Sequence, residues 1–176
     1  MLKVRNGDLD KLSLLFERYK KQLFVFFYKM TNDSQLSEDL VQNVFIRVLK
    51  YRRTFRGEGA FKVWLFHIGR NEFYDHHRRN KNNISLGPAD EDLTNHREDE
   101  QDREKEFNLK LLKIALNRLK VDRKEVIMLS KIDGLKYSEI ARILNCTEGT
   151  VKSKVFRALK ELREEFTKVS QHYEQG

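Results

Sequence analysis

The segment from Asp133 to Arg163 has the pattern of a helix-turn-helix whose second helix is basic. A short stripe of apolar residues with helical spacing ends at Asn145-Cys146, and Thr147 is placed to cap the helix that follows. The apolar face of that second helix comprises Val151, Val155, Ala158, Leu159 and Leu162. Its other face comprises Lys152, Ser153, Lys154, Phe156, Arg157 and Lys160. Such a face suits a DNA major groove, and the alternative is a solvated basic face on an ordinary helical hairpin.

The charge of the chain is distributed in three blocks. In total, 35 Lys and Arg against 27 Asp and Glu leave a net charge of +8. Residues 1–81 hold 17 basic and 9 acidic residues, residues 82–104 hold 2 and 8, and residues 105–176 hold 16 and 10. This distribution predicts two basic modules separated by an acidic connector. Basic surfaces of this kind bind nucleic acid, although acidic proteins and membranes are alternative partners.

Helical periodicity extends over most of the chain outside the connector. One Pro and eight Gly occur in 176 residues, and the sequence has no convincing set of alternating strands. Apolar spacing predicts helices from Leu9 to Phe27, over about residues 35–51 and over about residues 61–79. Thr31-Asn32-Asp33-Ser34 is expected to stop the first of these helices and to cap the second. Further on, Asp122-x-x-Glu125 resembles a capping box that opens a short helix through Lys131. We therefore predict an all-α fold with two small helical domains, residues 1–81 and 105–176, joined by a flexible acidic linker, residues 82–104.

Several functions are disfavoured by what the sequence lacks. No stretch approaches the ~20 apolar residues of a membrane span, and the N-terminal residues lack the apolar core of a secretory signal. Cys146 is the single cysteine, so no internal disulfide is expected and the predicted location is cytoplasmic. We expect it to be a small apolar filler, with a redox sensor as the alternative.

The sequence provides no case for catalysis. It contains no phosphate-binding loop, no nucleophile elbow and no zinc-protease motif. His76 and His77 are adjacent, so on a helix they point about 100° apart and do not share a metal site, whereas Asp75 and Arg79 form an i, i+4 pair. We predict that the chain is not an enzyme and uses no metal or cofactor.

Four separated motifs carry a resemblance to a known family. They are Asp39-Leu40-Val41-Gln42-Asn43-Val44-Phe45, Thr54-Phe55-Arg56-Gly57, Phe61-Lys62-Val63-Trp64-Leu65-Phe66 with Arg70-Asn71, and Glu148-Gly149-Thr150-Val151-Lys152-Ser153-Lys154. In identity, order and spacing the chain resembles the extracytoplasmic-function (ECF) sigma factors of bacterial RNA polymerase, which belong to the sigma-70 family. Asn43 stands where the family usually has an acidic residue, and Lys120-Val121-Asp122 lacks a common proline.

The resemblance implies a function, partners and sites. Residues 1–81 are expected to be sigma region 2 and residues 105–176 sigma region 4, in a subunit that directs core RNA polymerase to promoters. The implied partners are the polymerase β′ clamp and β flap, double- and single-stranded promoter DNA, and an anti-sigma factor. The implied polymerase-binding residues are Asp39, Gln42, Asn43 and Phe45. Those for the downstream (minus-ten) element are Phe55, Arg56, Gly57, Glu58, Gly59, Ala60, Arg70, Asn71, Arg78 and Arg79. Those for the upstream (minus-thirty-five) element are Thr150, Lys152, Ser153, Lys154, Phe156 and Arg157.

Alternatives remain at this point. Trp64 is expected in the core, with a stacking platform for unpaired bases as the alternative. Phe55 is expected either to form part of a base pocket in the loop of residues 55–60 or simply to fill the core. At the level of function, the alternatives are a helix-turn-helix regulator that binds DNA without polymerase and a helical scaffold for acidic proteins. A shift of promoter DNA by the protein alone, or only with core enzyme, distinguishes the first from a sigma factor.

Overall fold

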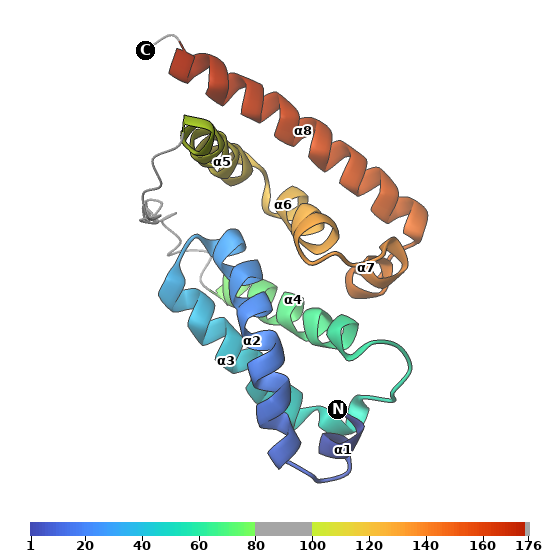
Figure 1. The fold of residues 1–176 in the computed structure, drawn as a ribbon. Helices are drawn as coiled ribbons and strands as arrows, with labels where there is room; N and C mark the ends of the chain where they lie inside the picture. The colour runs from blue at the N-terminus through green and yellow to red at the C-terminus, as the bar shows by residue number, and fades with distance from the viewer. Residues whose placement is uncertain (80–99, 175–176) are drawn as a thin grey trace. The chain divides into compact units, whose positions relative to one another are not determined.

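The computed structural model describes residues 1–79 and 100–174, and every regular element in these ranges is helical (Figure 1). The elements are α1 (Leu2–Arg5), α2 (Asp10–Thr31), α3 (Ser34–Lys50), η1 (Arg52–Thr54), α4 (Phe61–Arg79), α5 (Glu100–Arg118), α6 (Val121–Ile127), η2 (Met128–Ile132), α7 (Tyr137–Leu144) and α8 (Glu148–Glu174). The all-α prediction is confirmed. Most of the expected acidic linker lies outside the described residues, and α5 begins at Glu100.

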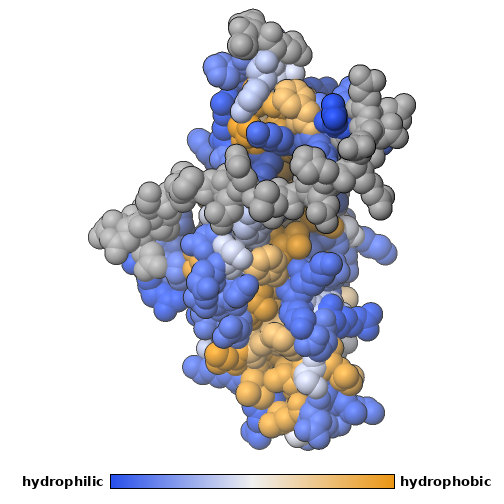
Figure 2. Space-filling model, turned by 60° about the vertical axis from the view of Figure 1, so that its left-hand side comes forward, coloured by the Kyte–Doolittle hydropathy of each residue, from blue (hydrophilic) through white to orange (hydrophobic). Residues whose placement is uncertain are grey.

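Contacts divide the described chain into two compact units. The first contains α1 to α4 and the segment Ser138–Thr147, and the second contains α5, α6, η2 and α8. Apolar side chains fill each core, and some also reach the surface among polar ones (Figure 2). No helix of the described residues has the length and apolar character needed to cross a membrane.

The break between α2 and α3 follows from local chemistry. Asn32 ends α2 in the left-handed conformation, with φ of 58°, which asparagine adopts more readily than most residues. Asp33 then caps α3, because its carboxylate accepts a hydrogen bond of 2.9 Å from the backbone N–H of Leu36. The helix stop and helix cap expected at Thr31-Asn32-Asp33-Ser34 are therefore present.

The core of the first unit brings together α2, α3 and α4. Its largest fully buried side chains are Leu23, Phe26, Phe27, Leu40, Leu65 and Phe66. Phe26 and Phe66 pack edge-to-face with their ring centroids 5.5 Å apart. A Cβ at Gly69 would lie 3.4 Å from both Leu23 Cδ2 and Phe27 Cζ, so glycine lets α4 approach α2 closely. Full burial of one such apolar side chain contributes roughly 1.5–3 kcal/mol.

The second unit is held by α5, α6 and α8. Its core includes Leu111, Ala115, Val126, Leu129, Val151, Val155, Ala158 and Val169. Arg123 Nε lies 3.1 Å from Glu161 Oε2, which joins α6 to α8. The predicted capping box is wrong, because Lys120 occupies the N-cap without a side-chain hydrogen bond and Asp122 lies inside the first turn of α6. The helix predicted after it is also interrupted, since its last residues form the π-helical turn η2.

Candidate polymerase and nucleic-acid interfaces

Three of the four expected polymerase-binding residues share one exposed face of α3. Asp39, Gln42 and Asn43 are exposed at spacings of three and four residues, which places them side by side on the helix. Ile46 continues this face one turn further and leaves 63% of its surface exposed. Sequence analysis missed Ile46, because its apolar side chain is typical of a core position and only the structure shows where it lies.

The fourth residue, Phe45, has a different environment. Its side chain is buried, and its ring packs edge-to-face on Phe16 of α2 with a centroid distance of 5.0 Å. Phe45 thus holds α3 against α2 and supports the exposed face from behind. Its side chain is not available on that face.

The segment between η1 and α4 is an exposed loop fixed at its first residue. Phe55 is only 6% exposed and packs edge-to-face with Trp64 and Phe61, at centroid distances of 5.4 and 5.9 Å. Residues 56–60 are exposed. Gly57 and Gly59 have φ of 80° and 91°, a backbone region that side chains other than glycine rarely adopt. The loop therefore exposes its glycine backbone and the side chains of Arg56 and Glu58 beside a buried aromatic anchor. Trp64 is half-buried within that anchor.

The expected base-reading residue Asn71 is exposed on α4, one turn after His67. Asn71 Nδ2 and His67 Nδ1 are 3.5 Å apart. Arg70 lies between them in sequence, and its guanidinium carbon stacks 4.6 Å above the centre of the Tyr74 ring. Stacking of this kind orients the arginine on the surface of α4.

Ion pairs join the end of α4 to α3. Arg47 of α3 pairs through Nε with Glu72 Oε2, and its Nη2 lies 3.1 Å from Asp75 Oδ2. Arg78 Nη2 lies 3.0 Å from Asp75 Oδ1, and Arg79 Nη2 lies 3.6 Å from Glu72 Oε1. The predicted pairing of Asp75 with Arg79 is therefore corrected: Arg79 Nε donates to the backbone carbonyl of Asp75, and its ion-pair partner is Glu72. Both arginines remain largely exposed, so their free N–H groups face solvent.

The upstream-element residues lie on α8, which begins directly after Thr147. Lys152, Ser153, Phe156 and Arg157 are exposed, whereas Val151, Val155 and Ala158 are buried, so helical periodicity separated the two faces correctly. Phe156 is 70% exposed, which is unusual for a phenylalanine in a folded domain. Thr150 and Lys154 are half-buried at the edge of this face.

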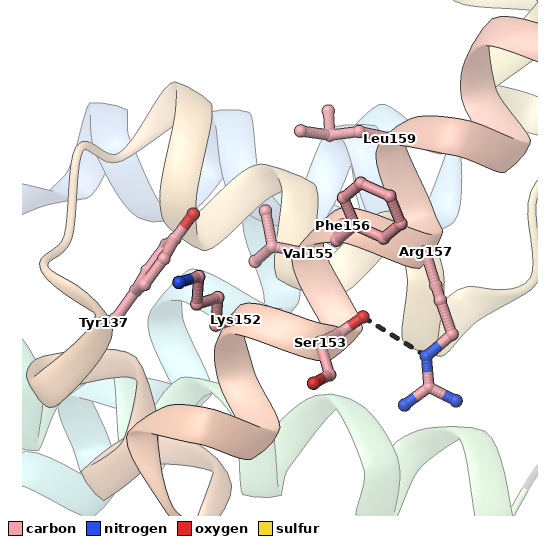
Figure 3. A pocket seen from close by; sticks show the side chains of 7 residues that line it. All are labelled: Tyr137, Lys152, Ser153, Val155, Phe156, Arg157 and Leu159. Atoms are coloured by element: carbon pink, nitrogen blue, oxygen red, sulfur yellow. Dashed lines mark hydrogen bonds between the residues drawn. The ribbon is translucent and has the colours of Figure 1, made fainter.

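A groove of about 620 Å³ runs along this face of α8 (Figure 3). Its lining consists of Tyr137, Lys152, Ser153, Val155, Phe156, Arg157 and Leu159. Lys152 extends toward the Tyr137 ring, while Arg157 Nε donates a hydrogen bond of 3.2 Å to the backbone carbonyl of Ser153. Cationic side chains therefore flank an apolar floor, an arrangement that fits phosphates and thymine methyl groups. Tyr137 was not anticipated from sequence.

Burial and the neighbouring Arg70 both lower the pKa of His67 below 6.5, burial being the larger cause. We therefore expect the C–H resonances of His67 to titrate in NMR with a midpoint below 6.5. Because burial dominates, Arg70→Gln is expected to raise that midpoint without restoring the ordinary value. A midpoint at or above 6.5 in the unmodified protein would contradict the burial of this ring. As the folded-state pKa is depressed, the contribution of His67 to stability is lost as pH falls below 6.5.

Two parts of the chain match models of known protein families. Residues 15–83 match the family model for sigma-70 region 2, and residues 110–162 match that for sigma-70 region 4. The ECF RNA polymerase sigma factor SigX of Bacillus subtilis is 34% identical over 161 residues, which cover 88% of this chain and 82% of SigX. The ECF RNA polymerase sigma-E factor of Haemophilus influenzae is 32% identical over 166 residues, covering 89% and 87% of the two chains.

The fold is also similar to that of a sigma factor of known structure. The sigma factor RpoE of Bartonella quintana, solved with the anti-sigma factor NepR, is 29% identical, with a TM-score of 0.68 and coverage of 91% of this chain and 97% of RpoE. The chain belongs to the ECF sigma factors of the sigma-70 family. It is thus a regulatory subunit that binds core RNA polymerase and directs transcription initiation at specific promoters.

Proposed function

We propose that this sigma factor acts through three surfaces: the exposed face of α3 for core polymerase, residues 55–60 with Asn71 for the downstream promoter element, and the exposed face of α8 for the upstream element. The observation that carries the proposal is the separation of faces on α8. A row of Lys152, Ser153, Phe156 and Arg157 faces solvent, while the opposite side of the same helix is buried. No packing role accounts for an exposed phenylalanine between two cations, whereas duplex DNA offers a partner for each group.

The α3 face is proposed to bind the β′ clamp. Asp39, Gln42 and Asn43 supply hydrogen-bonding groups around Ile46, whose exposed side chain is suited to be the apolar anchor of an interface. Phe45 contributes indirectly, because it fixes the position of α3. Region 4 is proposed to contact the β flap.

We expect the double variant Asp39→Ala/Gln42→Ala, and separately Ile46→Ala, to weaken binding to core polymerase by about tenfold or more, because interface anchors cost above about 1–2 kcal/mol when truncated. Stability should change by less than about 0.5 kcal/mol, since these side chains are exposed. Affinity for core enzyme measured by fluorescence anisotropy, with thermal unfolding in parallel, checks both statements.

Gln22→Ala and Leu14→Ala are the matched controls for the α3 variants, because they truncate an exposed glutamine and an exposed leucine on α2. Both controls should bind core polymerase normally. If the α2 and α3 variants lost equal affinity for core polymerase, the α3 face would not be the polymerase-binding surface.

We further propose control by an anti-sigma factor and a cytoplasmic location. Support for the first comes from RpoE of Bartonella quintana, which was solved in complex with the anti-sigma factor NepR and has the same fold. Support for the second is membership of a family that works on RNA polymerase. Co-purification of an anti-sigma factor with the tagged chain from its own cells, followed by loss of transcription when that protein is added back, tests the regulatory part.

A further inference from the structure

Helix α1 precedes the part of the chain that matches sigma-70 region 2, which starts at residue 15. It has only four helical residues, and a helix of this length is not stable by itself in water. Val4 is nevertheless fully buried. The turn after α1 is closed by backbone hydrogen bonds, including Gly7 N–H to Val4 O at 3.2 Å and Asp8 N–H to Lys3 O at 3.0 Å. Packing against the first unit therefore holds α1 in place.

The same helix touches the exposed loop. A Cβ at Gly57 would lie 3.1 Å from Leu2 Cδ2 and 3.7 Å from Leu2 Cδ1, so the Leu2 side chain packs directly on the Gly57 backbone. About half of the Leu2 surface is exposed. Gly57, whose φ is 80°, has no side chain to restrict its backbone, so the residue itself does little to fix the loop conformation.

We propose that α1 is a positioning element for the downstream-element loop, with Leu2 holding the backbone at Gly57 and Val4 anchoring α1 to the core. The proposal rests on the base-reading function proposed above for residues 55–60. A loop with two glycines loses more conformational entropy than other sequences when it is ordered on DNA. Contact with Leu2 orders the loop before DNA binds, and preorganisation of this kind increases both affinity and selectivity.

The test measures base discrimination with the complete holoenzyme. Single-stranded non-template oligonucleotides carry each of the four bases at every position of the downstream element, and the ratio of dissociation constants defines discrimination at each position. One good base contact gives about 5- to 150-fold discrimination. We expect Leu2→Ala and Val4→Ala to reduce this ratio by about threefold or more at the position read by the loop, while affinity for core polymerase is unchanged.

Matched controls separate positioning from general loss of stability. Leu14→Ala truncates another exposed leucine, and Val44→Ala truncates another fully buried valine, close to Gly69 in the centre of the core. Both should retain the ratio of the unmodified protein. Measurements are made at a temperature where thermal unfolding shows all four variants to be folded. A ratio that is unchanged in Leu2→Ala and Val4→Ala, or reduced equally in the controls, would overturn the proposal.

A loop variant distinguishes this failure from failure of the underlying function. The substitutions Gly57→Asn and Gly59→Asn alter the loop itself and should reduce discrimination at the same position. When the loop variant loses discrimination and the α1 variants keep it, α1 has no positioning role although the loop reads the base. When the loop variant also keeps it, the loop is not the reader, and the proposed base-reading function and the role of α1 are both wrong.

Discussion

Replacing Gly57, Glu58 and Gly59 together, by Asn, Ala and Asn, is expected to lower open-complex formation by about 100-fold. Extrusion of a base from the duplex costs a few kcal/mol, and a sigma factor has only binding energy with which to offset that cost. The loop exposes residues 56–60 beside the buried anchor Phe55, and its two glycines have positive φ angles. A Cβ at Gly57 would lie 3.1 Å from Leu2 Cδ2, so a side chain there displaces Leu2 and changes the surface that a base would meet, while asparagine still tolerates the left-handed backbone.

Permanganate reactivity of thymines in the melted region measures the effect directly, on a promoter chosen to contain them. Affinity for core polymerase and for upstream-element duplex should be unchanged in the same variant, because α3 and α8 are not altered. A loop transplanted from another ECF sigma factor should restore melting with a different preferred base. Normal melting and unchanged base preference after both exchanges would make the loop a simple connector.

Truncation of the exposed face of α8 has the second large expected effect. We expect Arg157→Ala to weaken binding of the upstream element by about 1–3 kcal/mol and to relax selectivity at one base pair. The hydrogen bond to Ser153 uses Nε of the exposed Arg157, so the terminal guanidinium nitrogens are placed for a bidentate contact with guanine. Phe156→Ala should reduce the preference for thymine at a neighbouring position. Lys152→Ala should instead weaken binding to every sequence to a similar extent, as expected for a phosphate contact.

Holoenzyme binding to a set of upstream-element duplexes, each with one substituted base pair, resolves these patterns. Lys168→Ala is the matched control, because Lys168 is an exposed cation near the other end of α8, where it pairs with Glu165 at 2.6 Å. It should leave both affinity and selectivity unchanged. Should Arg157, Phe156 and Lys152 all behave like Lys168, α8 does not read the promoter.

The sequence predicted the elements best where the signal is local. The third predicted helix, about residues 61–79, coincides with α4, and Asn32-Asp33 marks the end of α2 and the start of α3 as expected. Left-handed asparagine and an N-cap aspartate act within three or four residues, so a single sequence contains all the information they need. The division of α8 into a buried and an exposed face was equally accessible, because it depends only on helical spacing.

Tertiary packing decided the residues that the sequence did not place. Phe45 belongs to a motif implied to bind polymerase, yet its ring is buried on Phe16, while the apolar Ile46 beside it is exposed. Helical spacing places both residues on definite sides of α3, but only the position of α2 determines which side is covered. Helical spacing could not predict α1 for another reason. Its four residues are too few to show a period, and packing of Val4 in the first unit holds them in place.

The ion pairs at the end of α4 have a consequence for how ions take part in DNA binding. Arg78 and Arg79 already hold Asp75 and Glu72 in the free protein. If both arginines instead contact phosphates of the downstream element, the DNA releases condensed cations, but Asp75 and Glu72 are left to share the single cation of Arg47 and attract cations from solution. The net number of ions released per phosphate contact is then smaller than the number of arginines implies. Raising the potassium concentration would therefore reduce the affinity of α4 for the promoter strand by a smaller factor. The reference is a DNA-binding surface whose arginines and lysines form no ion pairs with carboxylates of the same protein.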